Sequence, residues 1–246
     1  MRFLAALFSI VLFNVFAFAK VPITVYLAGD STMADKRAEK RPETGWGEML
    51  GKYFRDGSVK IENHAQNGRS TRTFISENRW QTIVEKLKKG DYVFIQFGHN
   101  DQSKEKVDRY TPPEDYRKNL IRFVEEARAK KATPILMTPV MRRKFDADGK
   151  FVDQHGVYPD IVRSVAKDYA VALVDMHRES EKVLVRYGVE DSKKLFLQLK
   201  AGENPNYPNG VNDNTHFNPQ GAEEMAQLAV AGIKEQKIGL RKYLKK

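Results

Sequence analysis

The chain has 246 residues and a formal net charge of +10, because 42 lysines and arginines outweigh 32 aspartates and glutamates. It has no cysteine, which excludes disulfides, thiol catalysis and lipid attachment through an N-terminal cysteine. The excess positive charge favours acidic partners, and nucleic acid, anionic lipid and a polyuronic acid would all be attracted to it. The alternative is that scattered lysines only keep the protein soluble.

The first residues have the pattern of a secretory signal peptide. Arg2 precedes an apolar run over residues 3–18, and Ala17-Phe18-Ala19 matches a small-residue cleavage site. The run is short for a membrane anchor, and no later run is long enough to span a bilayer. We therefore expect residues 1–19 to be removed and the protein to be exported to a periplasm or out of the cell, which argues against a nucleic-acid partner. Residues 20–246 contain no repeat or linker and are expected to form a single domain.

The first predicted strand ends at a serine. Residues 23–28 are rich in β-branched and aromatic side chains and too few for a helix, so they predict a buried strand of a parallel sheet. The run stops at Gly29-Asp30-Ser31, and ligands of open α/β sheets bind at such strand ends. Taken alone, these three residues are also typical of a turn.

The rest of the chain alternates between predicted strands and predicted helices. Strands are predicted at 59–63, 92–97, 134–138 and 171–174, and helices at 79–89, 159–169 and 179–199 and from Gly45-Trp46-Gly47, Pro112-Pro113 and Pro219 onward. The charged segment 34–44 has no period and is expected to be a surface excursion beside Ser31. The polar loop 139–158 is expected to shape the binding cleft, or to form a short hairpin turning at Asp148-Gly149.

A stretch near the other end of the chain supplies an acid and a histidine three residues apart, Asp213 and His216. A serine hydroxyl becomes a good nucleophile when an imidazole takes its proton, and the imidazole needs a carboxylate to fix its tautomer. One loop can hold both side chains, just before a helix that Asn218 caps. The alternatives are a stabilised turn or a pair of metal ligands. Because no third and fourth ligand stand nearby at metal-like spacing, we expect no metal.

Two stretches that follow predicted strands complete the candidate site. They are Asn67-Gly68-Arg69 and Gly98-His99-Asn100-Asp101. Acyl transfer needs hydrogen-bond donors aimed at the developing oxyanion, and a glycine amide and an asparagine side chain can supply them beside the serine's own amide. Gly68 and Asn100 are therefore the oxyanion candidates, and His99 is expected to shape its loop.

Other histidines are weaker candidates for proton transfer. Asp175 and His177 imitate the acid and histidine pair, but they lack its approach to a helix start. His64 stands at a strand end, where a histidine is usually structural. We expect none of the three to take part in the chemistry.

Four blocks together resemble the SGNH branch of the GDSL hydrolases: Gly29-Asp30-Ser31, Gly68, Gly98-His99-Asn100-Asp101 and Asp213-Asn214-Thr215-His216. The extended forms at 28–34 and 67–74 resemble its rhamnogalacturonan acetylesterase subgroup, carbohydrate esterase family 12. The resemblance implies a flavodoxin-like α/β/α sandwich of three layers, with five parallel strands in the order 2-1-3-4-5, and no cofactor. It implies removal of acetyl groups from pectic polysaccharide. It also implies that Ser31 is the nucleophile, His216 the base and Asp213 the acid that orients it. The implied oxyanion donors are Ser31, Gly68 and Asn100.

Substrate choice is expected to depend on basic residues in the loops. Arg69 and Arg72 directly follow Gly68, and a guanidinium pairs with a carboxylate in a planar, bidentate way, so either residue could hold a galacturonate. A fold-internal ion pair is the alternative. Arg142 and Arg143 in the 139–158 loop are further candidates, as is Tyr207, which could stack on a sugar ring.

The leading functional hypothesis is therefore an exported serine esterase that deacetylates an acidic polysaccharide or oligosaccharide, rhamnogalacturonan for preference. An SGNH esterase of xylan, of other acetylated sugars or of lipid esters is an alternative. No long apolar loop stands out as an acyl pocket, which argues against the lipid. A carbohydrate-binding protein without turnover is the remaining alternative, and it would be favoured only by a broken catalytic set.

Overall fold

The computed structural model describes residues 22–246, and the predicted signal peptide lies outside them. Five parallel strands form the central sheet in the order β2-β1-β3-β4-β5, which confirms the predicted order. Each strand begins and ends within one residue of its predicted position. The strands are β1 Ile23–Gly29, β2 Val59–Asn63, β3 Tyr92–Gln96, β4 Thr133–Met137 and β5 Ala172–Val174.

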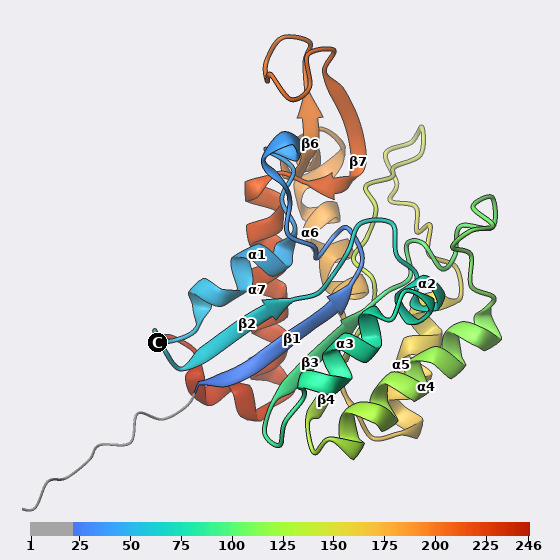
Figure 1. Cartoon of the computed structure of the whole chain (residues 1–246). Coiled ribbons are helices and arrows are strands. Elements are labelled where there is room, and N and C mark those ends of the chain that lie inside the picture. The colour runs from blue at the N-terminus through green and yellow to red at the C-terminus, as the bar shows by residue number, and fades with distance from the viewer. Residues whose placement is uncertain (1–21) are drawn as a thin grey trace, which may run out of the picture.

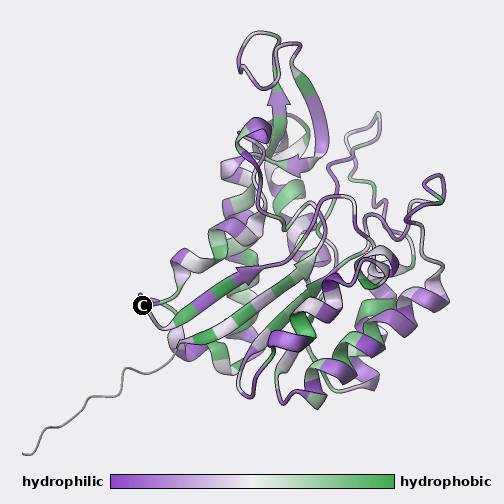
Figure 2. Ribbon diagram, viewed as in Figure 1, coloured by the Kyte–Doolittle hydropathy of each residue, from purple (hydrophilic) through white to green (hydrophobic). Residues whose placement is uncertain are grey.

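Alternate residues of the strands face two opposite layers of helices. Val25 and Leu27 of β1 belong to the core under α1 (Trp46–Leu50), α6 (Met176–Asp191) and α7 (Pro219–Glu235). Tyr26 and Ala28 belong to the core under α2 (Thr71–Ser76), α3 (Arg79–Lys86), α4 (Pro113–Ala129) and α5 (Tyr158–Asp168). Figures 1 and 2 show these two layers, with apolar helix sides turned toward the sheet. The fold is therefore the predicted three-layer α/β/α sandwich.

The segment before the last helix differs from its prediction. The predicted helix 179–199 is wrong beyond Asp191, because Gly188 leaves the helical conformation at φ 71° and α6 ends soon after it. The chain then forms the 3-10 turn η3 (Ser192–Leu195) and the strand β6 (Phe196–Leu199). Charged residues at helical spacing concealed this change, since a short strand has little periodicity to reveal it.

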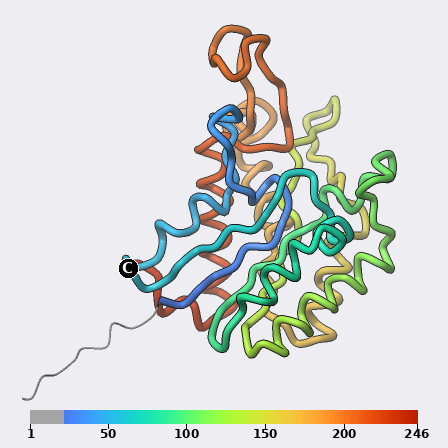
Figure 3. The backbone as a smooth tube through the Cα atoms, in the orientation of Figure 1, coloured from blue at the N-terminus to red at the C-terminus, as the bar shows by residue number. Residues whose placement is uncertain are grey.

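The predicted catalytic loop is itself a strand, β7 (Val211–Phe217), which pairs antiparallel with β6. Its sequence is polar and does not alternate, so backbone pairing rather than a buried face makes it a strand. Figures 1 and 3 show this hairpin projecting beyond the carboxyl end of the parallel sheet, beside the chain segment that carries the 3-10 turn η1 (Ala38–Lys40).

Smaller elements complete the fold. The helix α2 was not predicted, and α1 is short because the 3-10 turn η2 (Gly51–Tyr53) follows it; η4 (Gly239–Tyr243) lies near the C-terminus. In the 139–158 loop, Phe145 and Phe151 form an antiparallel bridge around Gly149 at φ 78°, as the hairpin alternative expects. Within residues 22–246, no helix combines the length and the apolar character needed to cross a bilayer.

Candidate active site

Ser31 lies directly beyond β1, at the carboxyl end of the parallel sheet. A Cβ added to Gly29 would come within 2.9 Å of both the Gln96 carbonyl oxygen and the Met33 sulfur, so the strand can approach its neighbour this closely only with glycine there. The Ser31 residue is 8% exposed. The turn therefore presents the hydroxyl from a tightly packed strand end.

Asp30 is fully buried and holds the turn from within. Its Oδ1 accepts hydrogen bonds from the N–H (3.0 Å) and the hydroxyl (2.8 Å) of Thr32, and its Oδ2 lies 3.2 Å from His99 Nδ1. Burial alone would raise the pKa of Asp30, but His99 and Thr32 outweigh it and lower this pKa. Burial also lowers the pKa of His99. The pair is thus a carboxylate beside a neutral imidazole, and it joins the Ser31 turn to the loop after β3.

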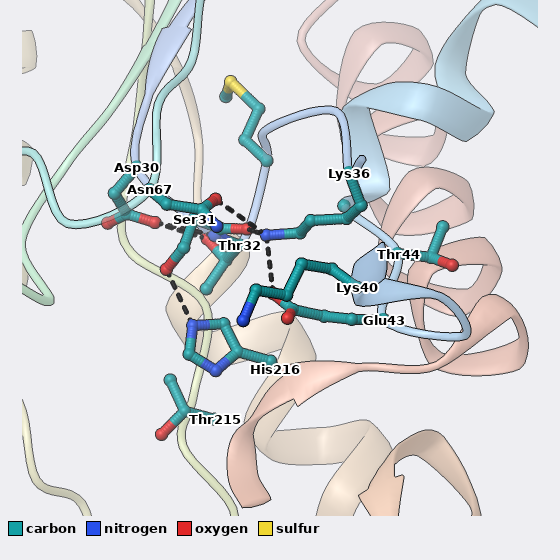
Figure 4. Close-up of polar contacts among 12 residues, drawn as sticks. Asp30, Ser31, Thr32, Lys36, Lys40, Glu43, Thr44, Asn67, Thr215 and His216 are labelled. Carbon is teal, nitrogen blue, oxygen red and sulfur yellow. Dashed lines mark hydrogen bonds and ion pairs between the residues drawn. The ribbon is translucent and has the colours of Figure 1, made fainter. Parts of the chain in front are cut away.

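The strand β7 carries Asp213 and His216 to the serine. His216 Nε2 lies 2.8 Å from Ser31 Oγ (Figure 4), and His216 Nδ1 lies 2.7 Å from Asp213 Oδ2. Asp213 Oδ1 also accepts the backbone N–H groups of Thr215 (2.7 Å) and His216 (2.9 Å). The imidazole can therefore take the hydroxyl proton at one nitrogen while it donates to the carboxylate from the other.

The carboxylate of this pair is strongly acidic. Burial would raise the pKa of Asp213, but the hydrogen bond and charge of His216, together with the two backbone N–H groups, lower it to about 2. Asp213 is therefore ionised wherever a histidine is neutral. Its charge keeps the proton of the neutral imidazole on Nδ1 and leaves Nε2 free to accept from Ser31.

Hydrogen bonds at the base of the hairpin, where β6 begins and β7 ends, hold β7 in place. The N–H of Thr44 donates to the Phe217 carbonyl oxygen (2.9 Å). Asn218 caps α7 as predicted, accepting from the N–H of Gly221 (3.0 Å), and its side-chain amide donates to the carbonyl oxygens of Lys194 and Phe196. The strand of the histidine is thus tied to α7, to β6 and to the segment after Ser31.

Gly68 and Asn100 face the same cavity as Ser31. Gly68 has φ 76°, a conformation that favours glycine, and the nearest atom to a Cβ built there, at 2.9 Å, is a terminal nitrogen of the flexible Arg109 side chain. The backbone N–H groups of Ser31 and Gly68 donate to no acceptor in the part of the chain that the structure describes. Asn100 Nδ2 donates one hydrogen to the Arg69 carbonyl oxygen (3.0 Å) and keeps a second one. Three donors are therefore available beside the hydroxyl.

Asp101 fixes the loop of Asn100 against α2. It is fully buried, and its Oδ1 accepts from the N–H (2.9 Å) and the hydroxyl (2.6 Å) of Thr71, the first residue of α2. Its Oδ2 has no partner among residues 22–246. Burial raises the pKa of Asp101 to about 7, although Thr71 opposes the shift. This carboxyl group was not singled out by the sequence, where its role is indistinguishable from that of a turn residue.

Lys36 is buried beneath the Ser31 turn. Its side chain is 1% exposed, and Figure 4 shows Nζ directed at three oxygens. It donates to the Ser31 carbonyl oxygen and to Asn67 Oδ1 (2.9 Å), and it lies 2.7 Å from Glu43 Oε1. The expectation that segment 34–44 is a surface excursion is therefore wrong for Lys36 and Glu43. Charge in the sequence suggested exposure, whereas here two charges are buried because they compensate each other.

This ammonium group connects three parts of the site. Asn67 precedes Gly68, and Glu43 precedes Thr44, whose N–H is bonded to the strand of His216. One side chain thus links the nucleophile turn, an oxyanion loop and, through one further residue, the strand of the histidine.

A cavity of about 410 Å³ opens over Ser31 and His216. It is lined by five cationic side chains, those of Lys40, Arg69, Lys106, Arg109 and Arg142. Arg69 also pairs with Glu77 at 3.0 Å. Of the five predicted substrate-binding residues, therefore, only Arg69 and Arg142 line this cavity.

Arg72, Arg143 and Tyr207 instead hold loops together. Arg72 donates to the Val107 carbonyl oxygen (2.6 Å), and the Tyr207 hydroxyl donates to the Lys40 carbonyl oxygen (2.9 Å). Arg143 uses all three of its nitrogens within the fold, on Ser192, Asn214 and Val189. Arg72 and Arg143 are thus held within the fold by uncharged acceptors, whereas the fold-internal ion pair that was the alternative for Arg69 and Arg72 is formed by Arg69, with Glu77.

Asp175 and His177 lie away from the serine. The reason for which the sequence set this pair aside is wrong, because Asp175 caps α6 and so stands directly at a helix start. Asp175 accepts from Arg163 and Thr138, and His177 Nε2 lies 3.2 Å from Asp153. Neither lines the cavity over Ser31. Among residues 22–246, no group of three or more histidines, cysteines, aspartates or glutamates is placed to hold a metal ion.

The chain belongs to the GDSL-like Lipase/Acylhydrolase family, whose model matches residues 27–224. The rhamnogalacturonan acetylesterase RhgT of Bacillus subtilis (strain 168) is 41% identical over 225 residues, covering 92% of this chain and 95% of the relative. The probable rhamnogalacturonan acetylesterase YesY of the same strain is 36% identical, covering 86% and 92%. The protein is accordingly a carboxylic ester hydrolase.

Solved structures agree on the fold. The YxiM protein of Bacillus subtilis aligns with a TM-score of 0.75 at 26% identity, covering 89% of this chain and 58% of that one. An acetylxylan esterase from Geobacillus stearothermophilus aligns with a TM-score of 0.60 at 19% identity, covering 87% and 96%. The second similarity bears on the fold alone.

Proposed function

We propose that this hydrolase removes O-acetyl groups from an acidic plant cell-wall polysaccharide, rhamnogalacturonan before others, by means of a Ser31-His216-Asp213 triad. The observation that carries the proposal is the hydrogen-bond chain from Ser31 Oγ through both nitrogens of His216 to Asp213. The names of the two relatives support the choice of substrate, and so do the cations around the cavity.

The proposed reaction has two halves. Ser31 Oγ attacks the acetyl carbonyl carbon while His216 Nε2 takes its proton, and the N–H groups of Ser31, Gly68 and Asn100 stabilise the oxyanion. The bond from carbon to the sugar oxygen then breaks, and His216 gives its proton to that oxygen, leaving an acetyl-enzyme. Water, deprotonated by the same imidazole, attacks the acetyl carbon and releases acetate and free Ser31.

We also propose that the enzyme is exported, on the N-terminal pattern of Arg2 and the apolar run 3–18. Mass spectrometry of the protein isolated from its native host should find an N-terminus at Lys20. A chain that retains residues 1–19 would contradict cleavage.

Ester hydrolysis of three substrates compared at equal ester concentration, followed as released acetate or, for the lipid, as released fatty acid, tests the proposed function. These are acetylated rhamnogalacturonan, acetylated xylan and a lysophospholipid, each with wild-type enzyme and Ser31→Ala. We expect the rhamnogalacturonan to be fastest and every rate to vanish in the variant. Faster release from xylan would move the substrate to neutral sugars, and an equal or faster lipid rate would reject the carbohydrate assignment. An inability to hydrolyse even an aryl acetate would favour a binding protein.

A further inference from the structure

We propose that a second cavity, beside the one over Ser31, is a subsite for a sugar carboxylate, and that Arg142 and Lys106 recognise this group. The inference rests on the proposed function and adds a recognition site to it. The second cavity has a volume of about 680 Å³, and Lys106, Arg142 and Thr215 line both cavities. A glycan bound with its acetyl group at Ser31 can therefore continue into the second cavity past these three residues.

Arg142 is a cation that lacks a carboxylate partner. It is partly buried between the cavities, and it donates through Nη1 to the Thr215 hydroxyl (2.6 Å) and through Nη2 to the His99 carbonyl oxygen (3.2 Å). Both acceptors are uncharged, and no carboxylate within residues 22–246 forms an ion pair with this guanidinium. Burial lowers the pKa of Arg142, although more distant acids oppose the shift.

A partly buried, unpaired guanidinium is costly unless an anion compensates it. Its five N–H donors are only partly used by Thr215 and His99, so donors remain for a planar anion. A carboxylate fits such a fork better than a hydroxyl does, because it can accept two parallel hydrogen bonds. The ligand that this position favours is thus an acidic sugar.

Lys106 supplies a second cation from the opposite loop. Its side chain is exposed, lines both cavities, and has no ion pair in the described part of the chain. Its backbone is ordered: the N–H donates to Ser103 (2.9 Å), and the carbonyl oxygen accepts from Arg109 (3.0 Å) and Tyr110 (2.8 Å). An exposed ammonium on a hydrogen-bonded loop can reach an anion that Arg142 orients.

The rest of the second cavity suits a sugar ring. Its lining includes Lys104 and a single acid, Glu105, so positive charge prevails, and Tyr110 and Tyr158 add aromatic surface. The volume lies within the roughly 300–1,000 Å³ that is usual for small-molecule sites. Carboxylate recognition is thereby assigned to the β3 and β4 side of the site, whereas the sequence had pointed first to Arg69 and Arg72.

The test compares two substrates that differ only in charge. One is an acetylated oligosaccharide that contains galacturonate, and the other is the same oligosaccharide with its carboxyl groups reduced to alcohols. We expect Lys106→Gln to lower kcat/KM about tenfold on the acidic substrate, mainly through KM, and to leave the reduced substrate almost unchanged. Lys89→Gln is the matched control, because it removes the same charge from an exposed position just before β3, at the opposite end of the sheet.

Added salt should shrink the wild-type preference for the acidic substrate and affect Lys106→Gln less, since the ammonium is exposed. Arg142→Gln should lose more on the acidic substrate than Lys106→Gln. Arg142 also contacts Thr215, next to His216. The rate of the Arg142→Gln variant on a neutral aryl acetate must therefore be measured, to separate loss of recognition from damage to the triad. Equal losses on both oligosaccharides, or no loss in Lys106→Gln, would overturn the subsite.

A binding measurement separates this inference from the proposed function. Calorimetry with an unacetylated galacturonate oligosaccharide needs no turnover, and it should show binding that Lys106→Gln weakens about tenfold and that carboxyl reduction abolishes. If this binding holds while acetylated pectin is not a substrate, the proposed function fails and the subsite stands. If rhamnogalacturonan is deacetylated but the oligosaccharide binds equally well after reduction, the subsite fails and the proposed function stands.

Discussion

The nucleophile and the base of the candidate triad stand in regions that are built differently. Ser31 is 8% exposed at the end of a strand buried between two helix layers. The side chains of Asp213 and His216 are 27% and 28% exposed, on a polar two-stranded sheet that projects from the fold. Tight packing and buried hydrogen bonds fix the serine, whereas partly exposed hydrogen bonds fix the histidine.

This difference shows in what each region depends on. The Ser31 turn depends on buried neighbours, such as Gly29, Asp30 and Lys36. The strand β7 depends on distant segments, because Arg143 bonds to Asn214 and Arg142 bonds to Thr215. Changes that loosen these contacts should therefore impair proton transfer before they impair folding.

The largest expected effect comes from removing either the nucleophile or the base. Ser31→Ala and His216→Ala should each lower kcat on the order of 10⁴- to 10⁶-fold, because a triad acts as a unit and its losses do not add. The measurement is aryl acetate hydrolysis, with circular dichroism as the control for folding. A double variant far slower than either single one would show that the two regions act independently.

Asn100→Ala should have the next largest effect. Removing one oxyanion donor usually costs about a hundred- to a thousandfold in kcat. The loss should appear in kcat with KM nearly unchanged, since the donor acts on the transition state. Asn100→Asp is a useful companion, because it keeps the size and replaces the donor with an acceptor. A loss confined to KM would mean that Asn100 binds only the ground state.

Lys36→Met tests the connection between the two regions. It leaves Glu43 buried without its partner, so we expect it to lower the free energy of unfolding by about 3–5 kcal/mol. Denaturant titration measures this change. The double variant Lys36→Met and Glu43→Gln should recover most of the stability but not the turnover, because Ser31 and Asn67 remain without their common donor. Full recovery of turnover would show that the ion pair of Lys36 and Glu43 contributes to stability alone.

Asp101→Asn should produce the smallest change, and this change should be confined to the buried region around Ser31. Burial raises the pKa of Asp101 to about 7. Between about pH 4 and about pH 7, therefore, the Asp101 carboxyl group is protonated in the folded protein and ionised in the unfolded chain. Wild-type stability should therefore fall by a few kcal/mol as the pH rises from about 4 to about 7, and then level off. The variant should lack this part of the slope in denaturant titrations across that range. A slope identical to that of the wild type would place the titration elsewhere.

The sequence predicts the parallel sheet well because four of its strands are largely apolar runs that end in glycine or polar residues, and β2 alternates between apolar and polar residues. The bounds of the strands follow from these patterns, and so does the place of Ser31 at a strand end, whereas the order of the strands was expected from the resemblance alone. The residues of the candidate triad were also selected from the sequence, because Asp213 and His216 lie close together just before a capped helix.

Long-range polar pairing left no such signal. The strand β7 contains no apolar alternation, and its partner β6 follows a helix without a clear stop. In the sequence, Lys36 stands in a charged segment of the kind that is usually solvated, and only the fold places Glu43 and Asn67 around it. Likewise, Lys106 and Arg142 stand 36 positions apart, and only the fold brings both to the same two cavities.

The contact between Ser31 and His216 joins residues 185 positions apart. During synthesis the serine turn can form early, with β1 and its neighbouring strands, but its base emerges only after nearly the whole chain has been made. A nascent or truncated chain would thus carry the nucleophile without the means to activate it. Ester hydrolysis consequently reports that the C-terminal hairpin has docked on the parallel sheet, and the recovery of activity after dilution from denaturant measures the rate of this docking.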